Sequence, residues 1–318
     1  MRAAVKDFLA DVHSRISLTM DLWTASNGDP YLGVTAHCID NNWDLKKIVL
    51  DVSGIRHPHD ADNMFIILNQ LLQRFNITTK LLSITSDNGP NIINTIEALR
   101  IHLNDNLLAT DFVGNRCAEH VMNLIVEAGI KPISQVVGKI RSFVIKLNKF
   151  SLYTQVHRQI AKELGQSQRK IPADVSTRWN SLYLILDVAS DAIETITALC
   201  MRYRQKKTLG GILLTTEEQQ IVHETKKYLK PFYNATNAVS GSSYPTTGLT
   251  IFALEYVSNN TAIHSSATSR STSWLKEAAE DMAEKMAEYT EMLFRFENLL
   301  QLYLTPESKP SSYRQISA

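Results

Sequence analysis

Two aspartates, Asp21 and Asp87, lie where short apolar stretches reach their ends, and this position suits metal chemistry. Residues 81–86 predict a buried strand, and Asn88-Gly89-Pro90 cannot continue it beyond Asp87. Ligands of α/β sheets gather outside the carboxyl ends of strands. Two neighbouring carboxylates can hold Mg²⁺ or Mn²⁺ and leave positions open for water and phosphate oxygens. The alternative, that both are ordinary turn or capping aspartates, stays open from the residues alone.

A cysteine and a histidine, Cys117 and His120, follow a further short apolar stretch. Cys-x-x-His can supply half of a zinc site, but no second pair lies at a suitable distance. We therefore do not expect zinc, and a buried thiol beside a histidine at a helix start is the alternative. Their position after the last predicted strand places them near the same end of the sheet as Asp87.

An arginine and a tryptophan, Arg178 and Trp179, begin a predicted helix over residues 178–200. A guanidinium group suits a phosphate contact, and an indole ring beside it suits stacking on a base. The alternative is a core tryptophan next to a surface arginine. The two residues alone do not decide between these interpretations.

Basic residues dominate residues 131–170, where nine lysines and arginines accompany a single acid, Glu163. This imbalance makes binding to the phosphate backbone of DNA a candidate function, although such a run is more often a solvated helix face. The candidate DNA contacts on the first predicted helix of this stretch are Lys139, Arg141, Lys146 and Lys149.

The elements that must position these residues follow from hydrophobic periodicity. An antiparallel meander over residues 16–20, 31–39 and 43–52 precedes a helix, a strand, a helix, a strand and a helix, ending near residue 127. Parallel crossovers are right-handed, so the fold expected is α/β, a five-stranded mixed sheet with its first strand beside the fourth. This is the ribonuclease H-like order, and it makes Asp21 and Asp87 neighbours. After residue 130 almost every segment predicts a helix.

Composition excludes several classes of protein. The chain has 318 residues and a net charge of +1, and its three widely spaced cysteines do not form a disulfide framework, which fits a reducing compartment. No apolar run reaches the length that crosses a membrane, and the first residues lack the apolar core of a signal peptide.

Taken together, these segments resemble the hAT (hobo/Ac/Tam3) DNA transposases over about residues 15–290. The resemblance rests on motifs that are specific in combination: Asp21-Leu22-Trp23-Thr24, residues 31–37, Thr85-Ser86-Asp87-Asn88, Arg116-Cys117-Ala118-Glu119-His120, Thr177-Arg178-Trp179-Asn180-Ser181 and Tyr228-Leu229-Lys230-Pro231-Phe232.

The resemblance implies an incomplete ribonuclease H-like catalytic core at 1–130, an all-helical insertion at 131–305 and a disordered tail at 306–318. It implies that Asp21 and Asp87 are the first two members of an Asp-Asp-Glu triad that binds Mg²⁺ or Mn²⁺. Cys117 and His120 would border this active site, and Arg178 and Trp179 would lie near it, the tryptophan serving a DNA base. The implied partner is DNA, and the implied compartment is the nucleus.

Three family features are not found in this sequence: the BED zinc finger, the triad glutamate and the C-terminal dimerisation region. We therefore assign no third carboxylate and leave both catalysis and self-association open. Two functions remain in competition, a metal-dependent transposase core and a non-catalytic nuclear protein that keeps the fold. A stand-alone ribonuclease H is weaker, because the helical insertion has no role in it.

Overall fold

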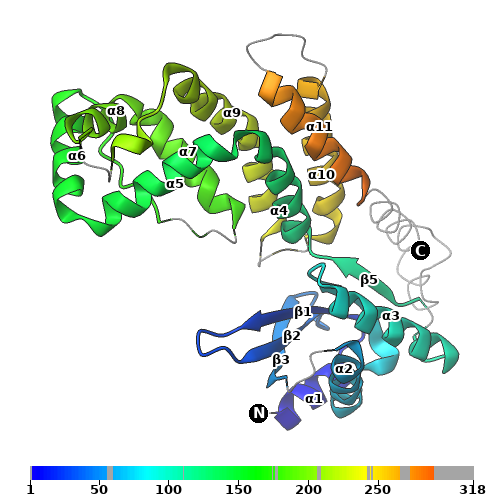
Figure 1. The fold of residues 1–318 in the computed structure, drawn as a ribbon. Helices are drawn as coiled ribbons and strands as arrows, with labels where there is room; N and C mark the ends of the chain where they lie inside the picture. Colours follow the sequence, from blue (N-terminus) through cyan, green and yellow to red (C-terminus); the bar gives the residue numbers. More distant parts are fainter. Residues whose placement is uncertain are drawn as a thin grey trace. The chain divides into compact units, whose positions relative to one another are not determined.

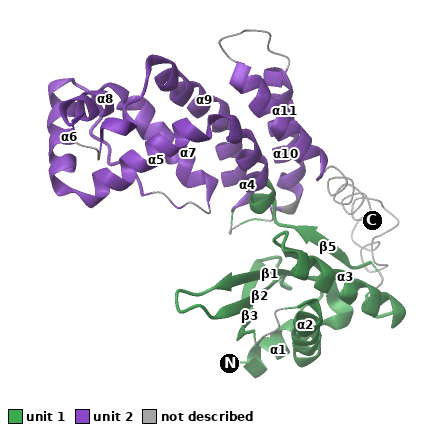
Figure 2. Cartoon of the chain, viewed as in Figure 1, with its two compact units in different colours: residues 1–121, 241–245 green, residues 122–240, 246–318 purple. Residues whose placement is uncertain are grey.

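The computed structural model describes residues 2–55, 60–109, 111–173, 175, 178–205, 209–241, 244, 246–265 and 273–289 (Figure 1). The chain forms two compact units, coloured separately in Figure 2. Unit 1 comprises residues 1–121 and 241–245, and unit 2 comprises residues 122–240 and 246–318. The unit boundary lies inside a helix, earlier in the chain than the predicted boundary at 130.

Unit 1 is built on one mixed sheet in the order β3-β2-β1-β4-β5, which confirms the predicted ribonuclease H-like arrangement. β1 pairs antiparallel with β2 and parallel with β4, and β4 pairs parallel with β5. The strands are β1 (Ile16–Thr24), β2 (Pro30–Ile39), β3 (Leu45–Gly54), β4 (Leu81–Ser86) and β5 (Val113–Arg116).

Alternation along the strands divides the sheet into an apolar and a polar face. On β1, Ile16, Leu18 and Met20 are buried, and they belong to one core with residues of the three helices of unit 1. Thr19 and Asp21, between and beyond them, point to the opposite face. These helices are α1 (Arg2–Asp11), α2 (Ala61–Phe75) and α3 (Pro90–Asp105).

β1 is longer than the sequence indicates, and Asp21 lies within it rather than after its end. Its last four residues pair with β2 alone, because the pairing with β4 stops at Met20 and Ser86. Pairing with β2 therefore extends β1 through Asp21 to Thr24, beyond Met20, the last residue of β1 that pairs with β4.

Unit 2 is helical in all of its described residues except connecting turns and loops. α5 contacts α6, α7 and α9, and α9, α10 and α11 pack in succession. The helices are α4 (Ala118–Gly129, which begins in unit 1), α5 (Ser134–Lys149), α6 (Ser151–Glu163), α7 (Trp179–Asp191), α8 (Ile193–Arg202), α9 (Thr216–Val239), α10 (Thr247–Ser265) and α11 (Ser273–Ala287).

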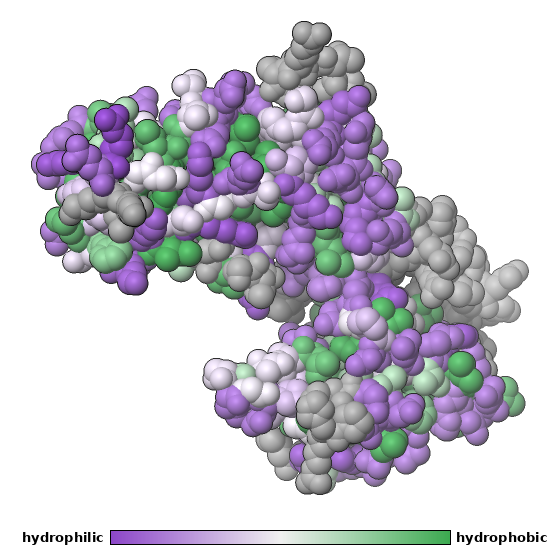
Figure 3. Space-filling view, viewed as in Figure 1, coloured by the Kyte–Doolittle hydropathy of each residue, from purple (hydrophilic) through white to green (hydrophobic). Residues whose placement is uncertain are grey.

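Two helix predictions differ from the structure. The single helix expected over 178–200 is two helices, α7 and α8, because Ala192 leaves the helical conformation at φ −117° and ψ 22°. The acidic helix expected over 277–303 is α11, which begins earlier, at Ser273; residues 290–318, including the predicted tail at 306–318, lie outside the described residues. The surface over α11 is mostly hydrophilic (Figure 3), in agreement with its exposed glutamates.

Candidate functional site

The strand register brings Asp21 and Asp87 to the same end of two adjacent parallel strands. Met20 and Ser86 are direct partners across β1 and β4, and each aspartate is the next residue along its strand. Neighbouring strands lie about 4.8 Å apart. The pairing runs in step from Ser17 and Ser83 to Met20 and Ser86. Alternation therefore puts Asp21 on the polar face of the sheet, and Asp87 directly follows the last paired residue of β4.

Asp87 is oriented by the turn that follows β4. Its Oδ1 accepts the backbone N–H of Gly89 at 3.1 Å, and Pro90 then begins α3. A Cβ at residue 89 would lie 3.3 Å from that oxygen, so the glycine leaves room for the carboxylate to fold over the turn. The local sequence Asp-Asn-Gly-Pro therefore ends the strand and fixes the acid at its tip.

Asp21 is exposed, and among the described residues its carboxylate makes no hydrogen bond or ion pair. Trp23, two positions along the strand and on the same face, forms a wall beside it. The Trp23 ring stacks on Tyr31 with centroids 5.8 Å apart, and a Cβ at Gly33 would lie 3.0 Å from it. Gly33 is the β2 partner of Asp21. No role was expected for Trp23, although its i+2 spacing from Asp21 could have placed it there.

Cys117 directly follows β5 and extends its ladder with β4, and its place at the border of an active site stays a prediction. Its backbone N–H donates to the carbonyl of Ser86 at 2.6 Å. Burial raises the pKa of the Cys117 thiol, and the negative charges of Glu119 and Asp21 raise it further. The backbone amides of His120 and Glu119 oppose this shift because they hydrogen-bond the sulfur. His120 lies in the first turn of α4, and no role for its side chain follows from these contacts.

The thiol group of Cys117 should react slowly with iodoacetamide at pH 8, because only the thiolate attacks and the raised pKa keeps it scarce. We expect labelling about tenfold slower than for free cysteine. Replacing Asp21 with Asn removes one cause of the shift and should speed the labelling of Cys117 by roughly twofold. Mass spectrometry of labelled peptides measures this. Cys38 and Cys200, both buried, are internal controls, and an equal increase at all three sites would contradict the proximity of Asp21.

A third carboxylate is not gathered with Asp21 and Asp87 in the part of the chain that the structure describes. Within it, no group of three or more histidine, cysteine, aspartate or glutamate side chains is arranged to hold a metal ion. Four glutamates near the end of the described chain could in principle substitute, and they belong to unit 2: Glu277, Glu280 and Glu284 on α11, and Glu288 just after it. The two aspartates are thus a pair of hard oxygen ligands rather than a complete triad.

Arg178 and Trp179 differ in exposure. Arg178 is exposed, whereas Trp179 is only 4% exposed at the start of α7. The Trp179 backbone N–H donates to Oδ1 of Asn123 at 3.1 Å, and its indole nitrogen has no hydrogen-bond partner among the described residues. Stacking of this ring on a base would require it to leave its packing, so its role in DNA binding stays a prediction.

The four basic candidates of α5 do not form one row. Lys139 and Lys146 are seven residues apart and share a side of the helix, whereas Arg141 is two residues from Lys139 and points elsewhere. Lys139 pairs with Glu218 at 2.6 Å, and Lys149 lies 5.8 Å from the centre of the Phe150 ring. DNA contact by this set stays a prediction.

Two family models match the chain. One is described as the ZBED1 RNase-like domain and covers residues 19–111, and the other as the ZBED1 RNase-like helical domain and covers residues 115–228. The matches contain Asp21, Asp87, Cys117, His120, Arg178, Trp179 and the four basic residues of α5, and they end before Glu277. Within the described residues, no helix combines the length and the apolar character needed to cross a membrane.

Curated relatives agree with these models. A "Putative AC transposase" of Zea mays is 31% identical over 248 residues, which is 76% of this chain and 30% of that protein. The zinc finger BED domain-containing proteins RICESLEEPER 3 of Oryza sativa and DAYSLEEPER of Arabidopsis thaliana are 25% and 22% identical over 75% and 74% of this chain, and 32% and 34% of their own lengths. The chain spans about a third of the length of these relatives.

Proposed function

Because the chain belongs to the hAT transposase family, we propose that its sheet is the metal-binding part of a DNA-cleaving core in which Asp21 and Asp87 hold Mg²⁺ or Mn²⁺. The observation that supports this proposal is the register of β1 and β4, in which Met20 and Ser86, the residues directly before the two aspartates, are partners. Neither aspartate has a basic partner among the described residues. Two uncompensated carboxylates repel each other, and a divalent cation relieves that repulsion with the oxygen ligands it prefers.

The residues around the proposed metal site have different roles. A bound divalent ion would polarise phosphate oxygens and water. Asp21 and Asp87 fix where that charge lies, and the Gly89 amide holds the Asp87 carboxylate in one orientation. Trp23 and Cys117 wall the site, and the protonated thiol adds no charge to it. DNA is the proposed substrate and the nucleus the proposed compartment, with self-association open.

A second function is supported by a specific observation, the pair of aspartates without a third ligand in the described residues. A chain of transposase ancestry can keep the sheet and the helical unit as a DNA-binding or interaction module without strand cleavage. Several relatives carry names of BED zinc finger proteins rather than of transposases. The two functions differ in catalysis and share the fold.

Titration of the chain with Mn²⁺, followed by calorimetry, tests the metal site. We expect one weak site, and Asp21→Asn or Asp87→Asn should raise its Kd at least about tenfold, or roughly 1.4 kcal/mol. Asp105→Asn is the matched control, because Asp105 is an exposed acid at the end of α3 in the same unit. Equal Mn²⁺ affinity in all three variants would contradict the assignment.

A further inference from the structure

A small hollow in unit 2 lies between α5, α6 and the segment that follows α6. Its volume is about 40 Å³, enough for about three water molecules or the oxygens of one phosphate group. Six of the residues that line it have polar or positively charged side chains suited to an anion: Thr154, His157, Arg158, Gln168, Arg169 and Lys170. We call it the α6 hollow.

The lining of the α6 hollow is cationic. Arg158, Arg169 and Lys170 contribute three positive charges, and no acidic residue lines it among the described residues. Arg158 and Lys170 make no hydrogen bond or ion pair within the described part of the chain, so both charges are uncompensated there. Free guanidinium and ammonium groups around a concave space are the usual partners of phosphate.

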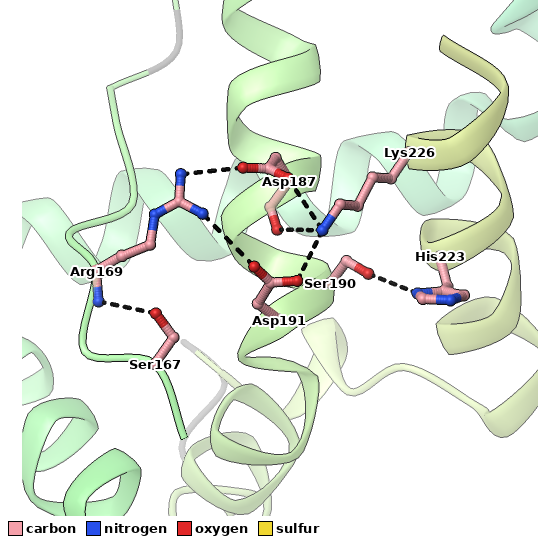
Figure 4. Close-up of polar contacts among 7 residues, drawn as sticks. All are labelled: Ser167, Arg169, Asp187, Ser190, Asp191, His223 and Lys226. Atoms are coloured by element: carbon pink, nitrogen blue, oxygen red, sulfur yellow. Dashed lines mark hydrogen bonds and ion pairs between the residues drawn. The ribbon is translucent and has the colours of Figure 1, made fainter. Parts of the chain in front are cut away.

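Arg169, which lines the α6 hollow, forms ion pairs with two aspartates of α7 (Figure 4). Its guanidinium group donates to Asp187 at 3.0 Å and to Asp191 at 3.5 Å, both on α7. Lys226 of α9 completes the network, with its Nζ 3.0 Å from Asp187 and 2.7 Å from Asp191. The four charges of this network cancel. This network therefore holds the segment that carries Lys170 against α7. The net positive charge of the lining then comes from Arg158 and Lys170.

His157 supplies a buried polar group next to these cations. It is 4% exposed on α6, and its Nε2 has no hydrogen-bond partner among the described residues. Burial lowers the pKa of His157, and Arg158 lowers it further, so the ring is neutral and adds no repulsion between the cations. The neighbouring Thr154 hydroxyl donates to the carbonyl of Leu147 at 2.7 Å. Its oxygen can therefore only accept hydrogen bonds from other groups.

We propose that the α6 hollow binds one phosphate group of a DNA backbone, held by Arg158 and Lys170. This inference rests on the proposed DNA-binding function and deepens it, because it locates a phosphate contact within the basic stretch 131–170 at residues other than the four named on α5. Lys139, the first of those residues, is neutralised by Glu218, whereas Arg158 and Lys170 are not neutralised within the described residues. The hollow carries no group that distinguishes bases, so it would contribute affinity without sequence preference.

The test is fluorescence anisotropy of a labelled duplex over a salt series, with EDTA present so that the Asp21 and Asp87 site plays no part. Replacing both Arg158 and Lys170 with Ala should weaken binding about tenfold for any sequence. It should also reduce the steepness of log K against log salt by about one, because one phosphate contact is lost. The matched control replaces Arg202 and Lys227, an exposed arginine and an exposed lysine of unit 2 outside both the hollow and the basic stretch 131–170, and should change neither value.

Exchange of the two cations, Arg158→Lys with Lys170→Arg, should keep both affinity and slope, which separates loss of charge from loss of fold. Inorganic phosphate at constant ionic strength should compete with DNA for the unaltered chain and not for the double Ala variant. Stabilisation by inorganic phosphate with unchanged DNA binding in the Ala variant would show a free-phosphate site and overturn the proposal. Equal losses in the control pair, or no DNA binding by the unaltered chain, would overturn it too, whereas the Mn²⁺ titration tests the aspartate site independently.

Discussion

We expect the purified chain to leave labelled transposon-end DNA uncut in the presence of Mg²⁺ or Mn²⁺. In-line phosphoryl transfer requires that the attacking water and the leaving oxygen are both held in position. Two carboxylates can bind one ion, but among the described residues no third ligand completes the set. Positioned charge carries much of the rate in such reactions, and loss of a single stabilising group costs about 10²–10³ in kcat. Gel electrophoresis of end-labelled strands measures the result.

The matched variant for this experiment is Asp87→Asn, which removes a ligand and keeps the shape of the side chain. Metal-dependent cleavage that is present in the unaltered chain and absent in Asp87→Asn would show the expectation to be wrong. It would also direct attention to Glu277, Glu280 and Glu284 of α11 and to Glu288 after it as sources of the third carboxylate, and each can be replaced by Gln in turn. Cleavage that survives Asp87→Asn would indicate a contaminating nuclease.

Lys80→Met should lower the free energy of unfolding by about 3 kcal/mol, because the ammonium group of Lys80 hydrogen-bonds the free carbonyls at the C-terminal end of α1. Lys80 Nζ donates to the carbonyls of Leu9, Ala10 and Val12 at 2.9, 2.7 and 2.7 Å. The carbonyls of Leu9 and Ala10 are among the last four of α1, which have no partner within the helix, and Val12 directly follows the helix. Methionine keeps much of the apolar stem of Lys80 and removes all three charge-assisted hydrogen bonds.

Lys6→Met is the control for this prediction, since Lys6 is an exposed lysine on the same helix and has no hydrogen bond or ion pair within the described residues. Urea unfolding followed by circular dichroism compares the two variants, and hydrogen exchange shows whether the loss of protection lies in α1. Equal stability of the two variants would mean that water replaces Lys80 at those carbonyls without cost.

The strand order was predictable because two strong constraints act on it. Alternation identifies the meander, and the handedness of crossovers then puts the fourth strand beside the first. The extension of β1 through Asp21 was not predictable, because it depends on pairing with residues 30–33 of β2 alone. The break between α7 and α8 at Ala192 was not predictable either, because no glycine or proline lies at that position.

The contacts of the candidate site residues were harder to predict from the sequence than the strand order of the sheet. Trp179 lies three and seven residues before Leu182 and Leu186, so helical periodicity already placed it with buried residues. The charge count of the basic run overlooks distant partners: Glu218 neutralises Lys139, and Asp187 and Asp191 neutralise Arg169. Local charge counts contain no information about such long-range pairs.

The central position of β1 has a consequence for the chain as it is synthesised. Ile16 pairs with Leu81, so the edge of β1 that later receives β4 stays open while roughly 65 more residues are made. At about 5–20 residues per second this interval lasts roughly 3–13 s. During it the meander presents an unpaired strand edge, and Leu18, Met20 and Val34 lack the cover of α3 throughout and that of α2 until Phe75 has been made. The ribosome-bound chain is therefore most exposed to pairing with other nascent chains between the third and fourth strands.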